Sequence, residues 1–269
     1  MVVLAILNAE RISYAPTPRF SIHDVNISAE QGERIAIIGP NGSGKSTMLR
    51  LITRLLQPNT GTVVLDGHDI RAMKGNEIAK ILAMLPQMQT GQHDLTVRDL
   101  VRYGRHPYQR WFSGMSKEDR EIVEWAIHAT RMDHLADQQL QSLSGGERQR
   151  AWIAMSLAQL PKVLLLDEPT TFLDISHQFE ILELISQLNK EMNMTIVSVL
   201  HDINQAAQYS DRLIVMKEGR MVAQGTPSEV LTHEMFEEVF EITVRIHYDD
   251  PYPYVRLMQC LRCDKPSCL

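Results

Sequence analysis

The stretch Gly39-Pro-Asn-Gly-Ser-Gly-Lys-Ser46 decides the fold of this chain. It follows Glu33–Ile38, a short apolar run typical of a buried strand, and precedes Thr47–Leu56, whose apolar residues recur at helical spacing. The pattern G-x-x-x-x-G-K-[ST] between a strand and a helix predicts a phosphate-binding loop. Glycines let the backbone curl until successive N–H groups face the phosphates, and the following helix adds its positive N-terminal end.

This loop predicts ATP as the ligand, together with Mg²⁺. Lys45 is expected to reach the β- and γ-phosphates, and the hydroxyl of Ser46 is expected to ligate Mg²⁺. The candidate nucleotide-binding residues of the loop are Gly39, Pro40, Asn41, Gly42, Ser43, Gly44, Lys45, Ser46 and Thr47.

A second chemical pattern is a pair of acids at the end of an apolar strand. Val163–Leu166 is followed directly by Asp167 and Glu168. Asp167 is expected to hold Mg²⁺, directly or through water, and Glu168 to orient and deprotonate the attacking water. Acidic pairs also occur on ordinary protein surfaces, so this pair gains its meaning from its combination with the phosphate loop.

Strands and helices alternate around these two patterns, which predicts a largely parallel sheet covered by helices. The further elements expected in this rhythm are the helix Ile175–Asn189, the strand Met194–Leu200, the helix Asp202–Tyr209 and the strand Arg212–Met216. Residues 88–157 differ, because their periodicity is helical throughout, in Thr96–Tyr103, Lys117–Thr130 and Gly146–Leu160. We therefore predict an inserted helical subdomain, in which Ser116 caps the second helix.

Composition restricts the class of protein. The 269 residues carry a net charge of −6, which argues against general nucleic-acid binding. The longest plain apolar runs are far shorter than the roughly 20 residues of a membrane span. The N-terminal MVVLAILNAE lacks the basic region of a secretory signal and is interpreted as a first strand. All three cysteines lie in the last ten residues, which is not a disulfide framework, so a cytoplasmic location is expected.

Leu143-Ser-Gly-Gly-Glu-Arg-Gln-Arg150 begins a helix after a polar turn. Ser144, Gly145 and Gly146 offer a hydroxyl and backbone N–H groups at a helix start, which predicts a second anion site. With the two patterns above, this stretch resembles the ATP-binding-cassette (ABC) ATPases, whose LSGGQ-type signature lies between them. The resemblance implies that this site binds the γ-phosphate of the nucleotide held by the opposite subunit. Glu147 stands where the family often has glutamine.

The resemblance assigns roles to four further positions. It implies that Tyr14 stacks on adenine; the alternative is an ordinary surface or core tyrosine. Gln87 matches the glutamine that contacts Mg²⁺ and the attacking water and senses the transmembrane partner. Phe172-Leu-Asp174 matches the D-loop, in which Phe172 replaces the more usual alanine or glycine. His201 matches the switch histidine that bonds the γ-phosphate and holds Glu168 and the water in line.

The resemblance also implies the fold and its limits. It implies an α/β P-loop NTPase (RecA-like) core with a mostly parallel sheet, an N-terminal antiparallel β part and the helical subdomain at about 88–157. The ATPase domain is expected over residues 1–240, with a C-terminal extension at 241–269. Tyr103–Pro107 and Ser116–Arg120 are similar to the cassettes of metal-chelate importers, which take up ferric siderophores, haem or cobalamin.

The function implied is ATP hydrolysis that powers an importer. Two copies, or this chain and a near-identical twin, would sandwich two ATP molecules and dock on integral-membrane permease subunits at the cytoplasmic side of the membrane. A substrate-binding protein would take part indirectly, and no nucleic acid is expected. The alternatives are a non-transport ABC ATPase and a nucleotide-binding scaffold that never hydrolyses. The short span between Gln87 and Ser144 leaves no room for long coiled coils, and intact Asp167, Glu168 and His201 argue against the scaffold.

The cysteine tail, Cys260-x-x-Cys263-x4-Cys268, is interpreted as an exposed tail. Zinc and iron–sulfur sites usually need four ligands, and only three cysteines are present. His247 or Asp264 would have to complete such a site. A redox role for the Cys260–Cys263 pair lacks a thioredoxin-like context.

Overall fold

In the computed structural model, the described residues are 5–18, 20–87, 94–109, 114–248 and 251–261. The strands are β1 (Leu7–Thr17), β2 (Phe20–Ala29), β3 (Arg34–Ile38), β4 (Thr60–Leu65), β5 (His68–Asp69), β6 (Leu82–Leu85), β7 (Val163–Asp167), β8 (Thr195–Val199), β9 (Arg212–Lys217), β10 (Arg220–Gly225), β11 (Ile242–His247) and β12 (Tyr254–Cys260). The α-helices are α1 (Lys45–Ile52), α2 (Gly75–Ile81), α3 (Val97–Tyr103), α4 (Lys117–Ala129), α5 (Gly145–Leu157), α6 (Ile175–Met192), α7 (Ile203–Tyr209), α8 (Pro227–Val230) and α9 (His233–Met235). Short 3₁₀ turns span His106–Tyr108, Asp133–Leu135 and Leu140–Ser142, and a π-helical turn spans Phe236–Phe240.

The strands form three sheets, and the predicted fold class is confirmed. The largest sheet has the order β10-β9-β3-β8-β7-β6, and β3 pairs with β9, and β6 with β7, in parallel. In the same sheet, β10 pairs with β9 in antiparallel orientation. The other sheets have the orders β2-β1-β4-β5 and β11-β12. The chain divides into a phosphate-loop unit (residues 8–29, 33–63 and 197–269) and a helical unit (1–7, 30–32 and 64–196).

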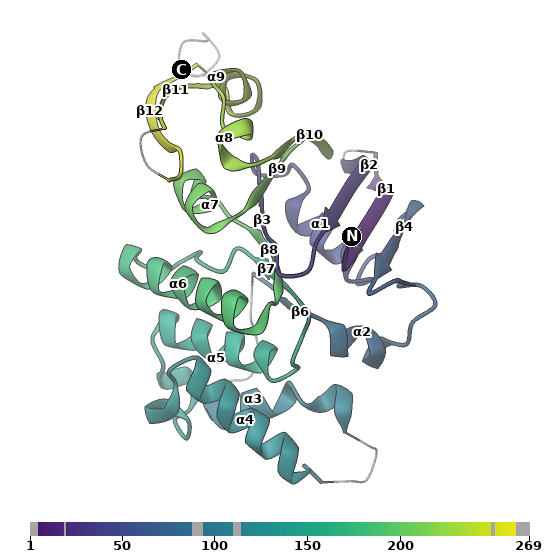
Figure 1. Ribbon diagram of the computed structural model, residues 1–269, viewed down its shortest axis with the longest axis vertical. Coiled ribbons are helices and arrows are strands. Elements are labelled where there is room, and N and C mark those ends of the chain that lie inside the picture. The colour runs from purple at the N-terminus through teal and green to yellow at the C-terminus, as the bar shows by residue number, and fades with distance from the viewer. Residues whose placement is uncertain (1–4, 19, 88–93, 110–113, 249–250, 262–269) are drawn as a thin grey trace. The chain divides into compact units, whose positions relative to one another are not determined.

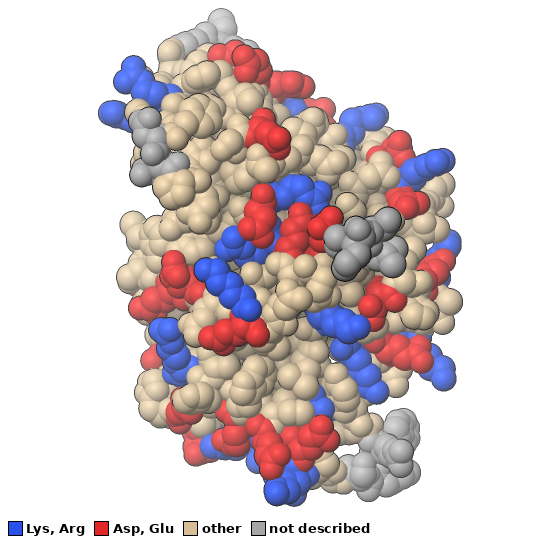
Figure 2. Space-filling model, viewed as in Figure 1, with Lys and Arg blue, Asp and Glu red and all other residues tan. Residues whose placement is uncertain are grey.

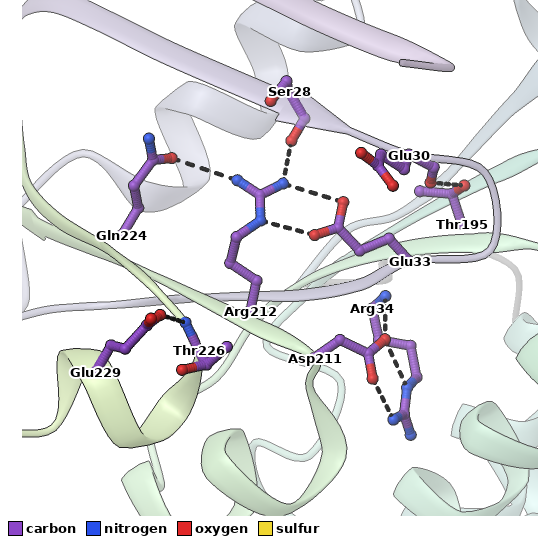
Figure 3. A network of polar contacts seen from close by, with 10 residues as sticks. All are labelled: Ser28, Glu30, Glu33, Arg34, Thr195, Asp211, Arg212, Gln224, Thr226 and Glu229. Atoms are coloured by element: carbon purple, nitrogen blue, oxygen red, sulfur yellow. Dashed lines mark hydrogen bonds and ion pairs between the residues drawn. The ribbon is translucent and has the colours of Figure 1, made fainter. Parts of the chain in front are cut away.

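In the phosphate-loop unit, two ion pairs lie at the N-terminal ends of the parallel strands β3 and β9 (Figure 3). The guanidinium of Arg34 bonds Asp211 at 2.6 Å, and that of Arg212 bonds Glu33 at 2.7 and 3.0 Å. Arg212 also donates to the carbonyl oxygen of Ser28. The strands beyond these pairs are buried and apolar, in the register Ile35↔Arg212 to Ile38↔Val215. Charged residues at the strand starts and apolar residues beyond them therefore favour this register of β3 against β9.

The helical unit has its own hydrophobic core, built by α3, α4, α5, α6, β6 and β7. The helices α3, α4 and α5 lie side by side, as Figure 1 shows. Ser116 caps α4 as predicted, because its hydroxyl accepts the N–H of Asp119 at 3.0 Å. The side chain of Asp119 in turn pairs with Arg105 at 2.8 Å, and both are buried.

Several predicted element limits were wrong, and three of them have a clear structural basis. Helix α1 begins at Lys45 and ends at Ile52, because the hydroxyl of Thr53 bonds back to helix carbonyls and Arg54 adopts a left-handed φ of 60°. Helix α5 ends at Leu157, since Leu160 has a φ of 52°. The first strand begins at Leu7 rather than at the N-terminus, whose residues 1–4 lie outside the described part.

Among the described residues, no helix is both long and apolar enough to cross a bilayer. Acidic and basic side chains are interspersed over the face drawn in Figure 2.

Candidate nucleotide-binding and catalytic site

The phosphate loop starts where the buried strand β3 ends, and close backbone contacts require its glycines. A β-carbon on Gly39, whose φ is 146°, would lie 2.0 Å from the carbonyl oxygen of Met216. One on Gly44, whose φ is 103°, would lie 2.4 Å from Ile22 Cδ1. Only glycine meets both demands, the positive φ and the absent side chain. The loop therefore turns sharply into the N-terminus of α1, as the sequence predicted.

Two side chains of this loop suit a bound polyphosphate. The ammonium of Lys45 donates to the carbonyl oxygens of Gly39 and Pro40 at 2.8 and 3.0 Å, and the side chain is buried. The hydroxyl of Ser43 is 2% exposed and has no hydrogen-bond partner in the described structure. A buried unpaired hydroxyl is costly unless a ligand satisfies it. The Lys45 ammonium and the Ser43 hydroxyl are therefore suited to bind phosphate oxygens.

Several other members of the loop are accessible. Asn41 and Gly42 are exposed, and Ser46 and Thr47 in the first turn of α1 are partly exposed. The first turn of α1 contains no acidic residue, so its positive end is not neutralised locally. A phosphate group approaching from solvent can reach these backbone N–H groups.

The phosphate-loop unit also holds His201 and Tyr14. His201 lies two residues after the end of β8 and is exposed. The preceding N–H, of Leu200, donates to the carbonyl oxygen of Ile37 at 3.3 Å, two residues before Gly39. The structure therefore brings His201 to the same strand ends as the loop. Tyr14 lies on β1 and is partly exposed, so one ring face can serve for stacking.

In the helical unit, the predicted carboxylates end a fully buried strand. Asp167 is the last residue of β7 and is 2% exposed. Glu168 follows in a left-handed conformation with a φ of 55°. For a residue with a β-carbon this conformation costs on the order of 1–2 kcal/mol, and such outliers cluster at functional sites.

The carboxylate of Glu168 is held by two partners. The amide nitrogen of Gln87 donates to Glu168 Oε2, although 81 residues separate them. The hydroxyl of Thr171 donates to the same oxygen at 3.0 Å. Sequence reasoning predicted Gln87 but missed Thr171, whose only signal is its place three residues after the glutamate. The two donors hold this carboxylate in one orientation, which suits a positioned general base.

The signature turn (Ser144–Gly146) caps α5. The hydroxyl of Ser144 accepts the N–H of Glu147 at 3.3 Å, and Glu147 Oε2 accepts the N–H of Ser144 at 2.9 Å. The Ser144 N–H and then its hydroxyl hold the pKa of Glu147 below its ordinary value. Glu147 thus belongs to a capping box here, which explains why an acid is tolerated at this position. The glycines that follow expose backbone N–H groups at a helix N-terminus.

Asp174 caps the N-terminus of α6. Its Oδ1 accepts the backbone N–H of His177 at 2.9 Å and the ring Nδ1 at 2.8 Å. The backbone N–H first, and then the ring, lower the pKa of Asp174 to about 2. Phe172, just before it, is 92% exposed with a φ of 65°. Sequence reasoning assigned no functional role to His177.

The predicted metal ligands supply hard oxygen donors. The described residues contain no cluster of three or more His, Cys, Asp or Glu side chains that could hold a metal. Mg²⁺ commonly takes one or two carboxylates and relies on substrate phosphates for further oxygens. The carboxylate of Asp167, the hydroxyl of Ser46 and the amide oxygen of Gln87 match that chemistry. Cys260 is partly exposed on β12, and Cys263 and Cys268 lie outside the described residues.

Buried contacts of Arg105 fix the segment Tyr103–Pro107, which resembles the cassettes of metal-chelate importers. The Arg105 guanidinium bonds Asp119 and the carbonyl oxygen of Ala158, each at 2.8 Å, and lies 3.8 Å from the ring centre of Tyr108. Beside it lies a surface hollow of about 300 Å³, lined by Leu95, Asp99, Arg102, Tyr103, His106 and Gln109.

Comparison with known proteins places these patterns among relatives. A family model described as ABC transporter matches residues 22–171. The petrobactin import ATP-binding protein FpuC of Bacillus anthracis is 54% identical over 249 residues, 93% of this chain and 92% of the relative. The ferric enterobactin transport ATP-binding protein FepC of Escherichia coli (strain K12) is 45% identical over 264 residues, 98% and 97% of the two chains. A solved dimeric bacterial ABC transporter cassette aligns with a TM-score of 0.71 at 29% identity, covering 82% of this chain and 98% of that one.

Proposed function

This chain belongs to the ABC transporter family as an ATP-binding protein, and on that premise we propose that it powers the import of a ferric siderophore or a related metal chelate. The observation that carries the hydrolytic part is the carboxylate of Glu168, oriented by Gln87 and Thr171 at the end of β7. A scaffold that never hydrolyses has no need for a strained, twice-bonded carboxylate. The cargo rests on the relatives, one of which is named for ferric enterobactin.

Nucleotide binding is the task of the phosphate loop. Backbone N–H groups from Gly39 to Thr47 and the Ser43 hydroxyl bind phosphate oxygens, and Tyr14 stacks on the adenine. Lys45 exchanges its contacts with loop carbonyls for the β- and γ-phosphates. This exchange costs little, because the ammonium is already desolvated and held in the loop. The site is thus preorganised before the nucleotide arrives.

Hydrolysis is the task of the carboxylate and its partners. Glu168 accepts a proton from the attacking water at its other carboxylate oxygen, while Gln87 and Thr171 hold Oε2 in place. His201 donates a hydrogen bond to the γ-phosphate and steadies the water. Ser46, Asp167 and the amide oxygen of Gln87 would hold Mg²⁺. When bound, Mg²⁺ would neutralise charge on the β- and γ-phosphate oxygens.

Two copies of the chain form the working assembly in this proposal. The signature turn and Asp174 of one copy complete the nucleotide site of the other, as a dimeric relative of the same fold suggests. Closing and opening of the dimer passes motion to separate permease subunits through Gln87 and the helical unit. The hollow beside Tyr103 is the surface that we assign to the permease. The complex would lie at the cytoplasmic face of the membrane.

The proposal is tested by reconstitution. The purified chain is assembled in lipid vesicles with permeases encoded near it, and ATP hydrolysis and uptake of radioactive ferric chelates are measured. We expect hydrolysis to rise with the correct permease and uptake to require ATP, with Glu168→Gln as the inactive control. Hydrolysis that no permease stimulates would favour a non-transport ATPase. Stimulated hydrolysis without uptake of any ferric chelate would overturn the cargo class alone.

A further inference from the structure

The imidazole of His177 lies directly against Gly146, in the first turn of α5. A β-carbon on Gly146 would lie 2.6 Å from His177 Cδ2 and 3.0 Å from Cγ. Contacts this short do not occur between real side chains, so a residue with a side chain at 146 would displace the ring or the helix start. The ring of His177 therefore occupies the space left by the second glycine of the signature turn.

Asp174 fixes the orientation of that ring. Its Oδ1 accepts the backbone N–H and ring Nδ1 of His177, and also the hydroxyl of Ser176 at 2.8 Å. Asp174 has a pKa of about 2, caused first by the His177 N–H, so it is ionised at neutral pH. An ionised carboxylate only accepts hydrogen bonds, and Nδ1 therefore carries the proton in this contact. With Nδ1 held, the Cδ2 edge of the ring remains on Gly146.

The starts of α5 and α6 meet at two further points. A β-carbon on Gly145 would contact Leu173 Cδ2 at 3.4 Å, which places the D-loop leucine beside the first signature glycine. One turn further, Arg150 on α5 pairs with Glu180 on α6 at 3.2 Å. The His177 ring is the central contact of this row, with its side chain 34% exposed.

We propose that His177 is a positioning residue that holds the signature turn in register with the loop Glu168–Asp174. This rests on the proposed function, because the register matters only if the signature turn binds the nucleotide of a second copy. The chain's own phosphate loop does not include these residues. Loss of His177 should therefore weaken ATP-driven pairing of two copies and leave ATP binding by a single copy intact.

The experiment compares variants in a Glu168→Gln background, in which ATP accumulates in the closed dimer. The dimer dissociation constant is measured by analytical ultracentrifugation with Mg²⁺-ATP, and single-copy affinity by a fluorescent ATP analogue at low protein concentration. His177→Ala should raise the dimer dissociation constant about tenfold, which is within the usual range of coupling between two sites. The analogue's affinity should stay within twofold of the parent.

Two replacements separate the contact of the His177 ring with Gly146 from its hydrogen bond to Asp174. His177→Phe keeps a ring on Gly146 and loses the bond to Asp174, whereas His177→Asn keeps an amide donor and loses the ring. We expect phenylalanine to recover more dimer than asparagine. Full recovery by asparagine would overturn the proposal, since His177 would then merely serve the cap. An unchanged dimer constant in His177→Ala, or an equal loss of single-copy affinity, would also overturn it.

His128→Ala is the matched control. His128 also bonds an aspartate, Asp133, through Nδ1 at 3.1 Å, but its side chain is 80% exposed. It should dimerise like the parent, and an equal loss there would overturn the role given to the Gly146 contact. A parent that does not dimerise with ATP would overturn the proposed function itself, which a defect confined to His177 variants would not.

Discussion

The side-chain amide of Gln87 donates to the carboxylate of Glu168 across 81 residues of sequence. The two residues follow neighbouring parallel strands, β6 and β7, whose ends lie at the same edge of the sheet. Strand pairing therefore decides which glutamine meets the candidate base. A permease signal that moves Gln87 would alter the orientation of Glu168 directly.

Glu168→Gln should abolish most hydrolysis while ATP binding persists. The replacement keeps the size and hydrogen bonding of the side chain but removes the base, so we expect kcat to fall about 10²- to 10⁴-fold. Steady-state phosphate release and ATP binding measure the two effects separately. Glu121→Gln, on the exposed face of α4, is the control. Normal turnover by Glu168→Gln would assign the proton transfer to another group.

Thr171→Val should slow hydrolysis without changing ATP affinity. It removes one of the two donors that hold Glu168 Oε2, at 3.0 Å. A loss of about 1.5 kcal/mol, the lower end of the range for a hydrogen bond to a charged group, corresponds to roughly tenfold in kcat. Thr171→Ser retains the hydroxyl and should hydrolyse ATP nearly as the parent does. Equal activity of the valine and serine variants would show that this hydroxyl does not orient Glu168.

Lys45→Ala should weaken nucleotide binding itself. The ammonium supplies the side-chain charge of the phosphate loop, and charge-assisted bonds contribute about 1.5–3 kcal/mol, or roughly 10- to 100-fold in affinity. Isothermal titration with Mg²⁺-ATP measures the change. Lys117→Ala removes a lysine whose side chain is 88% exposed, and it should bind ATP normally. Unchanged affinity in Lys45→Ala would remove this lysine from the phosphate site.

Arg105→Ala should destabilise the helical unit strongly. Its guanidinium is buried against Asp119 and Ala158, so removing it leaves a carboxylate without its partner in the interior. Breaking such a pair costs about 3–5 kcal/mol of the free energy of unfolding. Arg102→Ala breaks an exposed pair with Asp99, and the expected loss is below about 1 kcal/mol. Urea denaturation distinguishes the two, and equal losses would contradict the buried pair's role.

The same pair predicts a pH dependence of stability. Burial raises the pKa of Asp119, but bonds from Ser116 and Arg105 outweigh it and leave the pKa below the ordinary 3.8. A carboxylate with a lowered pKa stabilises the folded state when the pH is above the ordinary pKa of the group. This stabilisation is lost as the pH falls through the lowered pKa of the folded state. The midpoint temperature of thermal unfolding should therefore decrease as the pH is lowered below about 4. The Asp119→Asn variant should have a lower midpoint temperature at neutral pH, and that temperature should decrease less at acidic pH. An equally steep decrease in the variant would assign the pH dependence to other carboxylates.

Local sequence predicted the elements better than their limits. The phosphate loop lies within eight consecutive residues, so its glycines and Lys45 were readable without any partner. The end of α1 was not, because the hydroxyl of Thr53 and the left-handed Arg54 override apolar spacing that continues beyond them. The domain limits of 1–240 and 241–269 remain a prediction, as do the roles assigned to the site residues.

The sequence by itself determined the parts whose chemistry is written in neighbouring residues: the phosphate loop, the acids after β7 and the cap of the signature turn. Tertiary structure alone decided which distant groups hold these parts in place. Thr171 and Gln87 converge on Glu168, and His177 fills the space over Gly146, because strand pairing and helix packing bring them there. Spacing cannot predict such contacts, since they depend on side-chain direction and packing between elements rather than on periodicity along the chain.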